Sequence, residues 1–484
     1  MSENDLYEPV IGLEIHAQLL TKSKLFCGDA VSFGDTPNSH VSAISLAHPG
    51  TLPRVNKEAV KLAIRLGLAL NCQINRHSVF ARKNYFYPDL PKGFQTSQHT
   101  EPICKGGRIP LNADSTLKSG VALHHIHLEE DAGKSIHDVD DLHTCIDLNR
   151  AGVALVEIVT EPDIFSSSEA YECLTMIRKI VRHLEVCDGN MEEGSLRCDA
   201  NISIRKKGEK NLGTKVEIKN LNSIRNVKRA IDHEIERQTK VLKRGEKITQ
   251  ETRSFDAETG STFSLRTKEQ ENDYRYFAEP DIPPVHISED EIAQILASSP
   301  MLPHEWETKL ITQYHLPPSS AALIADEVIL RSVFLIAVEN TKEYGIVANW
   351  LIGPVKSYFN EQIDETVDEK KLSDVVVQLT ALTANNQVAF SMAASHIFPN
   401  MMRCETSALE LAKQKNLLQV NDSDELQNWI EQVLQKMPEK VSEYKKGKTN
   451  LIGLFAGEVK KASQGKADMK QVINILKEKL NKDL

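Results

Sequence analysis

The sequence lacks closely paired cysteines. Its eight cysteines are scattered, and no two of them have the Cys-x-x-Cys spacing of a metal-binding knuckle. Cysteines spread this thinly are typical of reduced, buried thiols in a cytosolic protein. We therefore expect neither a disulfide framework nor a structural zinc site.

Long apolar segments are missing as well. No run of about 18 apolar residues could form a membrane-spanning helix, and residues 1–9 contain no charged-then-apolar leader. We expect a cytoplasmic protein that does not contact a membrane. The net charge of −10 argues against a uniformly basic nucleic-acid-binding surface, although it allows a local basic patch.

The chain is too long for one hydrophobic core, because 484 residues exceed the size at which single domains stop growing. Residues 1–292 combine alternating strand patterns with amphipathic helices. They predict an α+β domain with a mainly antiparallel sheet and flanking helices. After residues 280–284, which are rich in proline, helical patterns dominate. We predict a helical linker domain at 293–405 and an all-α tail domain at 406–484.

Helix start signals support this organisation. Asn56 can cap a helix from Lys57 to about Leu70, and Ser166 with Glu169 can form a capping box for a helix that ends near residue 184. A third, longer helix is predicted over 223–244.

Polar residues gather on one face of the predicted strands. In residues 126–134, Ile126 and Leu128 face one way, while His127 and Glu129 face the other. The same alternation occurs at 10–19, 153–161, 196–205 and 214–220. The residues on these polar faces are Glu14, His16, His127, Glu129, Glu157, Asp199 and Glu217.

Each of these residues alone is more often a solvated or packing side chain. Five carboxylates on the polar strand faces of one domain favour a shared site. If these faces line one concavity, the mutual repulsion of the carboxylates raises several of their pKa values unless a cation lies among them. Carboxylate oxygens with one or two imidazoles suit Mg²⁺ or Mn²⁺ better than zinc. Such ions neutralise charge in phosphoryl transfer, so the pattern indicates a metal-dependent phosphoryl-transfer site.

The stretch from Arg82 to Gly93 interleaves cations with aromatic residues. Two prolines and a glycine predict an ordered loop without a regular element. Its composition suits the binding of phosphates and the stacking of a base, but it also suits a surface loop anchored by aromatic residues. Nearby, residues 133–135 read Gly-Lys-Ser without the first glycine of a Walker A loop, so we predict no standard P-loop.

The tail is locally basic on an acidic chain. Residues 406–484 contain 14 lysines against 11 acidic residues. A run of this kind is usually a solvated face; the alternative is a patch that follows phosphates. The candidate residues are Lys445, Lys446, Lys448, Lys460 and Lys461.

Several long strings of residues resemble the B subunit of aspartyl/glutamyl-tRNA amidotransferases, the GatB family. These strings extend, together with the tail, over nearly the whole chain. They lie at 11–16, 82–93, 126–134, 149–152, 157–163, 188–201, 219–223 and 273–277.

The resemblance implies a cradle domain, a helical linker and a tail similar to the small helical YqeY family. It implies ATP- and Mg²⁺-dependent phosphorylation of the side-chain carboxylate of Glu-tRNA(Gln), Asp-tRNA(Asn) or both, followed by amidation. The chain has no amidase signature of the Ser-Ser-Lys type. The family uses a separate amidase A subunit that supplies ammonia from glutamine, together with a small C subunit.

The resemblance also assigns residues. The catalytic set would be Glu14, His16, Glu129, Glu157, Asp199 and Glu217, and all of these except Glu157 are expected metal ligands. Lys83 and Tyr85, with Arg82, Tyr87 and Lys92 of the same stretch, would bind ATP or the aminoacyl end. The tail lysines would hold the body of the misacylated tRNA.

One departure from the family concerns zinc. Many members carry a zinc knuckle of two cysteine pairs near the N-terminus. Here Cys27 is present, but Asp29, Ser42 and Ser45 occupy the other positions. We predict that this knuckle is absent.

Two other functions fit the same residues. One is a two-metal phosphatase or nuclease, which would hydrolyse phosphate esters without ATP or glutamine. The other is a non-catalytic tRNA-binding adaptor with structural carboxylates, which would keep full activity in the complex after Glu129→Ala.

Overall fold

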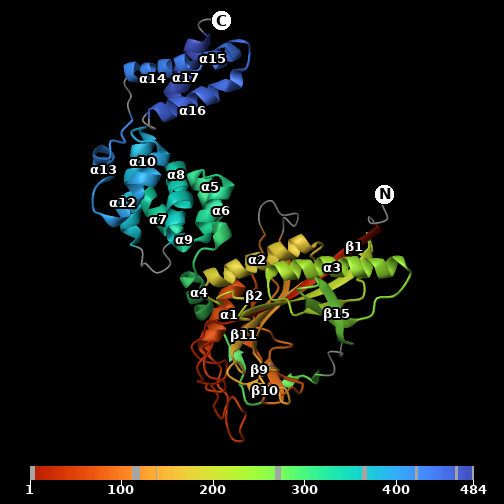
Figure 1. The fold of residues 1–484 in the computed structure, drawn as a ribbon. Helices are drawn as coiled ribbons and strands as arrows, with labels where there is room; N and C mark the ends of the chain where they lie inside the picture. Colours follow the sequence, from red (N-terminus) through yellow and green to blue (C-terminus); the bar gives the residue numbers. More distant parts are fainter. Residues whose placement is uncertain are drawn as a thin grey trace. The chain divides into compact units, whose positions relative to one another are not determined.

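The computed structural model describes residues 6–111, 120–137, 139–267, 274–361, 368–419, 423–463 and 467–481. The chain divides into two compact units, Met1–Pro303 and His304–Leu484. The first unit contains the sheets, and the elements described in the second are helices (Figure 1). The first unit extends beyond residue 292, because Ile295 of helix α4 (Glu289–Ser298) and Leu302 are buried in its core.

A ten-stranded mixed sheet forms the centre of the first unit. Its pairs are antiparallel apart from β13 with β14, which is parallel. From one edge to the other its strands are β15 (Ser261–Thr267), β14 (Glu251–Asp256), β13 (Val216–Lys219), β12 (Leu196–Lys206), β1 (Tyr7–Gln18), β11 (Ala154–Thr160), β8 (Val121–Glu130), β6 (Cys104–Lys105) and β2 (Gln73–Ile74), with β7 (Arg108–Ile109) also paired to β8.

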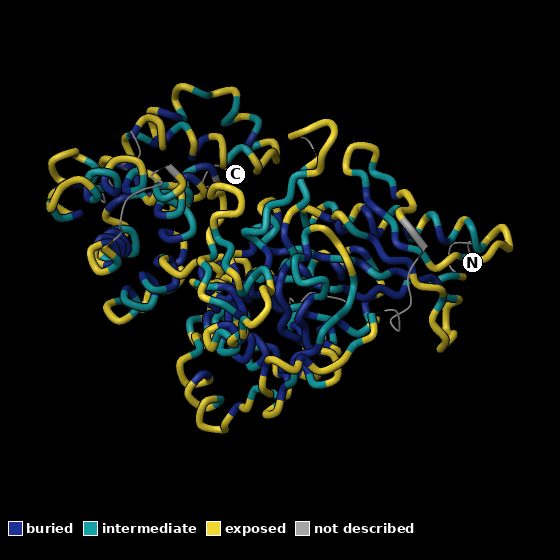
Figure 2. Tube along the Cα trace, turned by 90° about the horizontal axis from the view of Figure 1, so that it is seen from below, coloured by how far each residue is buried: buried dark blue, intermediate teal, exposed yellow. Residues whose placement is uncertain are grey.

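Helices cover the apolar face of this sheet. The strand residues Ile11, Leu13 and Ile15 are buried in one core with residues of α1 (Lys57–Ala69), α2 (Ser167–His183) and α3 (Ile224–Lys243). Helices α2 and α3 lie side by side over the strands (Figure 1). The central strands form the buried interior of the unit (Figure 2). The candidate site lies on the opposite, polar face of the sheet.

The predicted helix starts are confirmed. The Asn56 side chain accepts hydrogen bonds from the backbone N–H groups of Glu58 and Ala59, so it caps α1. Ser166 accepts from the backbone N–H of Glu169 at the start of α2. Ser223 caps α3 in the same way, and each cap satisfies donors that the first helical turn leaves unpaired.

The prediction that the stretch from Arg82 contains no regular element is wrong. Residues Ala81–Asn84 form β4, which pairs with β5 (Phe94–Ser97) and β16 (Phe277–Ala278). The two prolines lie between β4 and β5, where no ladder hydrogen bond is needed. The stretch is a hairpin with a long connection, and strand alternation places Arg82 and Lys83 on opposite faces.

Strand β8 contains a β-bulge. Val159 of β11 pairs with His125, but Thr160 pairs with Leu123, so His124 is an extra residue. The bulge changes the phase of the strand: Val121 and Leu123 are buried in the core before it, and Ile126 and Leu128 after it. As a result, His124 and His125 both lie outside the core.

Close backbone packing explains the glycine at 133. Its N–H donates to the carbonyl of Asp89 (2.8 Å), and its own carbonyl accepts from Arg150 Nη2 (2.6 Å). A Cβ at this position would lie 2.8 Å from the Asp147 carbonyl oxygen and 2.9 Å from that of Asp89. The next residue, Lys134, begins β9 (Lys134–Ile136), which pairs with β10 (Cys145–Asp147). The Gly-Lys-Ser stretch is thus a packing site that leads into a strand.

Two short strands, β3 (His77–Ser78) and β17 (Val285–His286), complete the first unit. In the second unit one core, around Phe334, Trp350 and Leu379, spans residues 310–412. Its elements are α5 (Pro303–Tyr314), α6 (Pro318–Asp326), α7 (Val328–Val338), α8 (Tyr344–Trp350), η3 (Leu351–Val355), α9 (Lys356–Glu361), α10 (Glu369–Ala384), α11 (Phe390–Met392), η4 (Ala393–Ile397), α12 (Phe398–Arg403) and α13 (Ala408–Gln414).

A separate core around Phe455 and Leu476 lies in the tail. Its elements are α14 (Ser423–Lys436), α15 (Pro438–Lys445), η5 (Thr449–Leu451), α16 (Ile452–Ala462) and α17 (Met469–Asn481). Among the residues that the structure describes, no helix is both long enough and apolar enough to span a membrane.

Candidate active site

One group of titratable side chains contains His16, Glu129 and Glu157. Each offers a ligand atom, and these atoms lie within 4.8 Å of one another. His16 Nε2 is 3.3 Å from Glu157 Oε2 and 3.8 Å from Glu129 Oε1. His127 Nε2 lies 3.5 Å from the Oε2 atom of both glutamates. Two imidazoles therefore face the same pair of carboxylates.

The strand register brings this group together. His16 of β1 is the direct partner of Glu157 in β11, and Glu157 is the direct partner of His127 in β8. Glu129 follows two residues later on the same face of β8. The three strands are adjacent in the sheet, so side chains from positions 16, 127, 129 and 157 meet on its polar face.

A second group contains Glu14, Asp199 and Glu217, whose ligand atoms also lie within 4.8 Å of one another. Glu14 is the cross-strand partner of Asp199. Lys219 Nζ lies 2.6 Å from Asp199 Oδ2 and 3.5 Å from Glu217 Oε1. The structure thus gathers all six predicted catalytic residues on one face, but in two groups of three.

The electrostatics of the first group depend on its close pairs. Burial alone would lower the pKa of His16, but Glu157 and then Glu129 raise this pKa to about 9. Burial would raise the pKa of Glu157, but His16 and His127 hold it well below its usual range. These pairs favour a charged imidazole beside a charged carboxylate.

In the second group the pKa of Glu14 is raised, first by burial and then by Glu157 and Glu217. Because the charge on Glu157 acts on Glu14, the two groups are electrostatically linked.

Lys83 and Tyr85 lie beside the first group. Although burial acts to lower it, the pKa of Lys83 is raised by Glu129 and further by Glu157, so the lysine stays charged. Its Nζ lies 5.9 Å from the ring centre of Tyr85 and 5.1 Å from that of Tyr274. Burial raises the pKa of the Tyr85 hydroxyl.

Sequence reasoning assigned no role to Tyr274 and Tyr276. Their rings are 6.1 Å apart, and Tyr276 stacks on His99 at 4.1 Å. Asn84 Nδ2 donates to the Tyr274 and Arg275 carbonyl oxygens, at 3.2 and 2.8 Å. The family-like string at 273–277 was the sequence signal for these two tyrosines. The contact of Tyr274 with Lys83, however, depends on pairing between β16 and β4. Asp273 lies outside the described residues.

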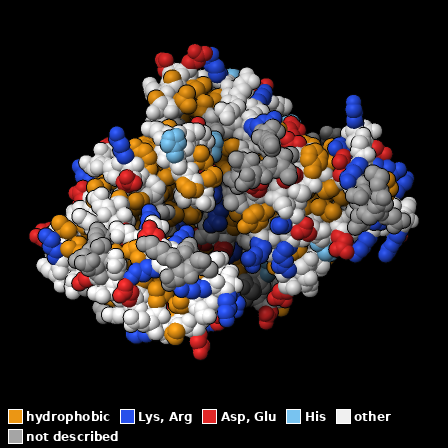
Figure 3. Space-filling model, turned by 90° about the horizontal axis from the view of Figure 1, so that it is seen from above, with side chains coloured by type: hydrophobic (Ala, Val, Ile, Leu, Met, Phe, Trp, Pro, Cys, Tyr) orange, Lys and Arg blue, Asp and Glu red, His pale blue; other side chains and the backbone are white. Residues whose placement is uncertain are grey.

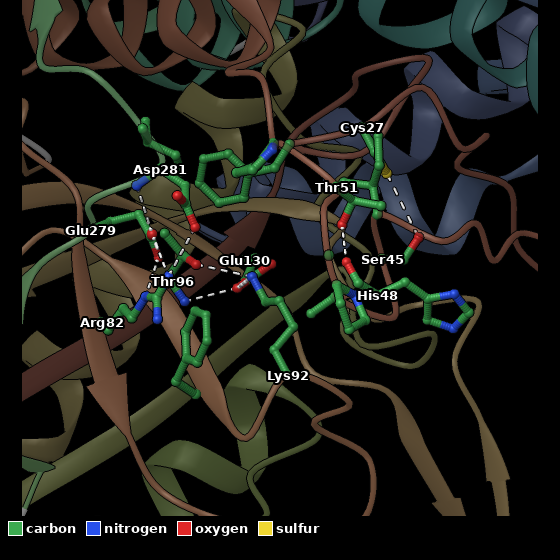
Figure 4. A pocket seen from close by; sticks show the side chains of 18 of the residues that line it. Cys27, Ser45, His48, Thr51, Arg82, Lys92, Thr96, Glu130, Glu279 and Asp281 are labelled. Atoms are coloured by element: carbon green, nitrogen blue, oxygen red, sulfur yellow. Dashed lines mark hydrogen bonds and ion pairs between the residues drawn. The ribbon is translucent and has the colours of Figure 1, made fainter.

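Arg82 and Lys92 line a different cavity, of about 350 Å³ (Figure 4). Arg82 donates to both carboxylate oxygens of Glu279, at 2.7 and 2.8 Å, and to Asp281. Lys92 forms an ion pair with Glu130 and donates to Thr96 Oγ1 at 2.9 Å. The other predicted ATP-binding residue, Tyr87, is 49% exposed, and its ring lies 5.9 Å from that of Tyr85. The predicted set is thus divided between two places.

The tail lysines lie near the ends of α15 and α16. Lys446, Lys448, Lys460 and Lys461 are exposed, and Lys445 is half-buried. Lys448 pairs with Glu443 at 3.1 Å, and Lys461 pairs with Glu458 at 2.5 Å. Basic and acidic side chains are also interspersed over the face of the molecule in Figure 3. The candidate patch is therefore partly neutralised by its own neighbours.

The four residues at the family's zinc-knuckle positions form a hydrogen-bonded group. The Ser42 N–H donates to Asp29 Oδ2 at 3.0 Å, and Ser45 Oγ also donates to this carboxylate. Cys27 Sγ lies 3.7 Å from Ser45 Oγ. Burial raises the pKa of the Cys27 thiol, which disfavours the thiolate that zinc requires. The absence of zinc stays a prediction.

Both acidic groups have donor atoms of the type that Mg²⁺ prefers, namely carboxylate oxygens with at most one imidazole. In the second group, the Lys219 ammonium is already hydrogen-bonded to Asp199. The first group fits an ion better, because a metal could replace the extra proton that His16 carries. Glu157 belongs to this group, although the predicted ligands did not include it.

Comparison with known families agrees with this architecture. A family model described as the GatB/GatE catalytic domain matches residues 9–293, and one described as the GatB domain matches residues 332–480. The chain belongs to the GatB family. Several bacteria contain similar proteins that are named as the B subunit of aspartyl/glutamyl-tRNA(Asn/Gln) amidotransferase.

The relative from Thermodesulfovibrio yellowstonii is 44% identical over 97% of this chain and 98% of its own length. Those from Alkalilimnicola ehrlichii and Persephonella marina are 43% and 42% identical, each over 98% of this chain and 99% of its own length. The GatB-family match thus covers both structural units. The catalytic-domain match includes both acidic groups and Lys83.

Proposed function

We propose that this chain is the B subunit of a tRNA-dependent amidotransferase. Its reaction would convert misacylated Glu-tRNA(Gln), Asp-tRNA(Asn) or both into the correctly charged amide, with ATP and glutamine as co-substrates. The observation that carries this proposal is the group of His16, Glu129 and Glu157 with Lys83 at its side, inside a region that matches the catalytic domain of the GatB family.

The chemistry requires activation of a carboxylate. A carboxylate is a poor acyl electrophile, because its leaving group would be oxide. Transfer of the γ-phosphoryl group of ATP to the glutamyl or aspartyl oxygen gives an acyl phosphate and ADP. Ammonia then forms the C–N bond, the C–O bond to phosphate breaks, and the leaving hydrogen phosphate carries away one ammonia proton.

The residues of the first group suit the first step. A bound Mg²⁺ would neutralise part of the negative charge of the phosphates. His16, Glu129 and Glu157 would hold it, and the second group could hold a further cation. Lys83 provides a fixed positive charge beside these carboxylates, so it can attract the substrate carboxylate or a phosphate oxygen. Tyr85 and Tyr274 flank the lysine and limit its movement.

The chain has no amidase signature, so the supply of ammonia requires a partner subunit. We propose that an amidase A subunit hydrolyses glutamine and supplies ammonia, with a small C subunit in the complex. The exposed lysines of the tail, Lys446, Lys448, Lys460 and Lys461, would contact the phosphates of the tRNA body. We also propose that residues 1–292 act as a cradle for the acceptor end and that 406–484 act as the tRNA-binding tail.

The deciding experiment reconstitutes the three-subunit complex and supplies ATP, glutamine and each misacylated tRNA. We expect Gln-tRNA or Asn-tRNA to appear together with ADP and phosphate. Ester hydrolysis without ATP would instead support the phosphatase or nuclease function. If Glu129→Ala retained full activity in the complex, the adaptor function would be supported.

A further inference from the structure

Three histidines of β8 form a continuous row of ring contacts. His124 Nδ1 lies 2.6 Å from His125 Nδ1, and His125 Nε2 lies 3.0 Å from His127 Nδ1. The rings of His125 and His127 are stacked, with centres 5.0 Å apart. The row begins at the exposed His124 and ends at the buried His127, which faces Glu129 and Glu157.

The β-bulge makes this row possible. In a regular strand, His124 and His125 would point to opposite faces. Because His124 is the extra residue of the bulge, both imidazoles lie outside the core and touch each other. Bulges commonly redirect a side chain next to a functional site.

Only one arrangement of protons satisfies all the contacts when the three rings are neutral. His127 must carry its proton on Nε2 to donate to the carboxylates, so its Nδ1 accepts from His125 Nε2–H. His125 Nδ1 then accepts from His124 Nδ1–H. A hydrogen bond to one imidazole nitrogen determines which tautomer the ring adopts and where its other nitrogen points.

The surroundings of His125 suit this role. Burial, followed by the neighbouring rings of His127 and His124, lowers its pKa to about 4. A neutral ring can donate from one nitrogen and accept at the other. The other groups around it are His99, Glu157 and, across the strand pair, Lys105.

We propose that His125 is a positioning residue: its contact with His127 Nδ1 directs the Nε2–H of His127 at the carboxylate pair of Glu129 and Glu157, and in the neutral ring it selects the Nε2–H tautomer. Through this contact His127 restrains the two carboxylates from the side opposite His16. The contribution to catalysis rests on the proposed function, but the tautomer assignment does not. Partners of this kind, one contact beyond the reacting groups, typically change metal affinity or activity by 10- to 100-fold.

The test uses ¹⁵N-histidine NMR of the full chain without nucleotide or metal, at alkaline pH where the rings are neutral. The His127 signals are assigned with His127→Gln. We expect one tautomer in the wild type and a mixture of both in His125→Phe. His125→Gln keeps a side-chain N–H donor and should restore the single tautomer. His143→Phe, at a histidine paired with Asp140 on the surface, is the matched control and should change nothing.

Activity in the reconstituted complex gives the second readout. His125→Phe should lower kcat about tenfold, with little change in the KM for tRNA, and His125→Gln should recover most of this loss. An unchanged His127 tautomer in His125→Phe would overturn the proposal, whatever the activity. If wild-type protein shows the single tautomer but no amidation, the proposed function fails while the tautomer assignment stands.

Discussion

His16 Nε2 lies 3.3 Å from Glu157 Oε2, and the two residues are direct cross-strand partners in β1 and β11. This contact couples the protonation of the site to the folding of the sheet. Burial lowers the pKa of His16, and the charge of Glu157 with its hydrogen bond makes the largest contributions that raise it.

The first prediction concerns stability as a function of pH in magnesium-free buffer. The His16 pKa is raised from 6.5 to about 9. Its contribution to the free energy of unfolding is therefore full below pH 6.5 and is lost as the pH rises through about 9. We expect a loss of a few kcal/mol over this window, measured by urea unfolding. Glu157→Gln should flatten the curve, whereas Glu258→Gln, at an exposed turn, should not.

The second prediction concerns Lys83. Replacement by Met removes the cation beside Glu129 and Glu157, so we expect kcat for amidation to fall by on the order of a hundredfold. Glutamine hydrolysis by the partner amidase should persist. Lys240→Met, at an exposed lysine paired with Glu236, is the control for loss of one positive charge. A normal kcat in the Lys83→Met complex would show that Lys83 has no role in the reaction.

The third prediction tests whether Arg82 acts in nucleotide binding or in the stability of the fold. Arg82→Met leaves the buried Glu279 carboxylate without its bidentate partner, which should lower the free energy of unfolding by about 3 kcal/mol. The exposed pair of Arg76 and Glu289 offers a control, because Arg76→Met should cost less than about 1 kcal/mol. A stable Arg82→Met protein with a raised KM for ATP would instead support the predicted role in nucleotide binding.

The fourth prediction concerns the tail. Replacing Lys446 and Lys460 by Glu reverses two exposed charges, so tRNA affinity should fall and its salt dependence should weaken. We expect the KM for tRNA to rise about tenfold with kcat unchanged. Lys370→Glu with Lys371→Glu makes the same charge change on exposed residues of α10, outside the tail. Equal effects of both pairs would indicate general attraction rather than a tail site.

The fifth prediction concerns zinc. Protein purified without chelators should contain no stoichiometric zinc by elemental analysis, because Asp29 already accepts hydrogen bonds from both serines. Restoring cysteines at 29, 42 and 45 should allow one equivalent to bind with Cys27. Stoichiometric zinc lost from the wild type on Cys27→Ser would contradict the prediction.

Local patterns predicted much of the fold. The strands at β1, β11 and β12 and the caps at Asn56 and Ser166 follow from alternation and short-range hydrogen bonds. The polar face of the sheet was predicted for the same reason, since side-chain alternation needs no knowledge of the neighbouring strand.

The position of β1 between β11 and β12 could not be predicted, because it depends on contacts between residues more than a hundred positions apart. The division of the carboxylates into two groups follows from that order. Arg82 and Lys83 lie on opposite faces of a strand because this stretch forms a hairpin, which its prolines had argued against. The bulge did leave a signal: Leu123 and Ile126 are both core residues three positions apart, a spacing that breaks strict alternation.

Close packing around the glycine at position 133 limits which substitutions the chain can tolerate there. Gly133 brings the connection after β4 to within hydrogen-bonding distance of the segment before β9. A single added methyl group would collide with two peptide oxygens. Gly133→Ala should therefore push these segments apart and yield a temperature-sensitive enzyme, even though position 133 contributes no functional group to the reaction.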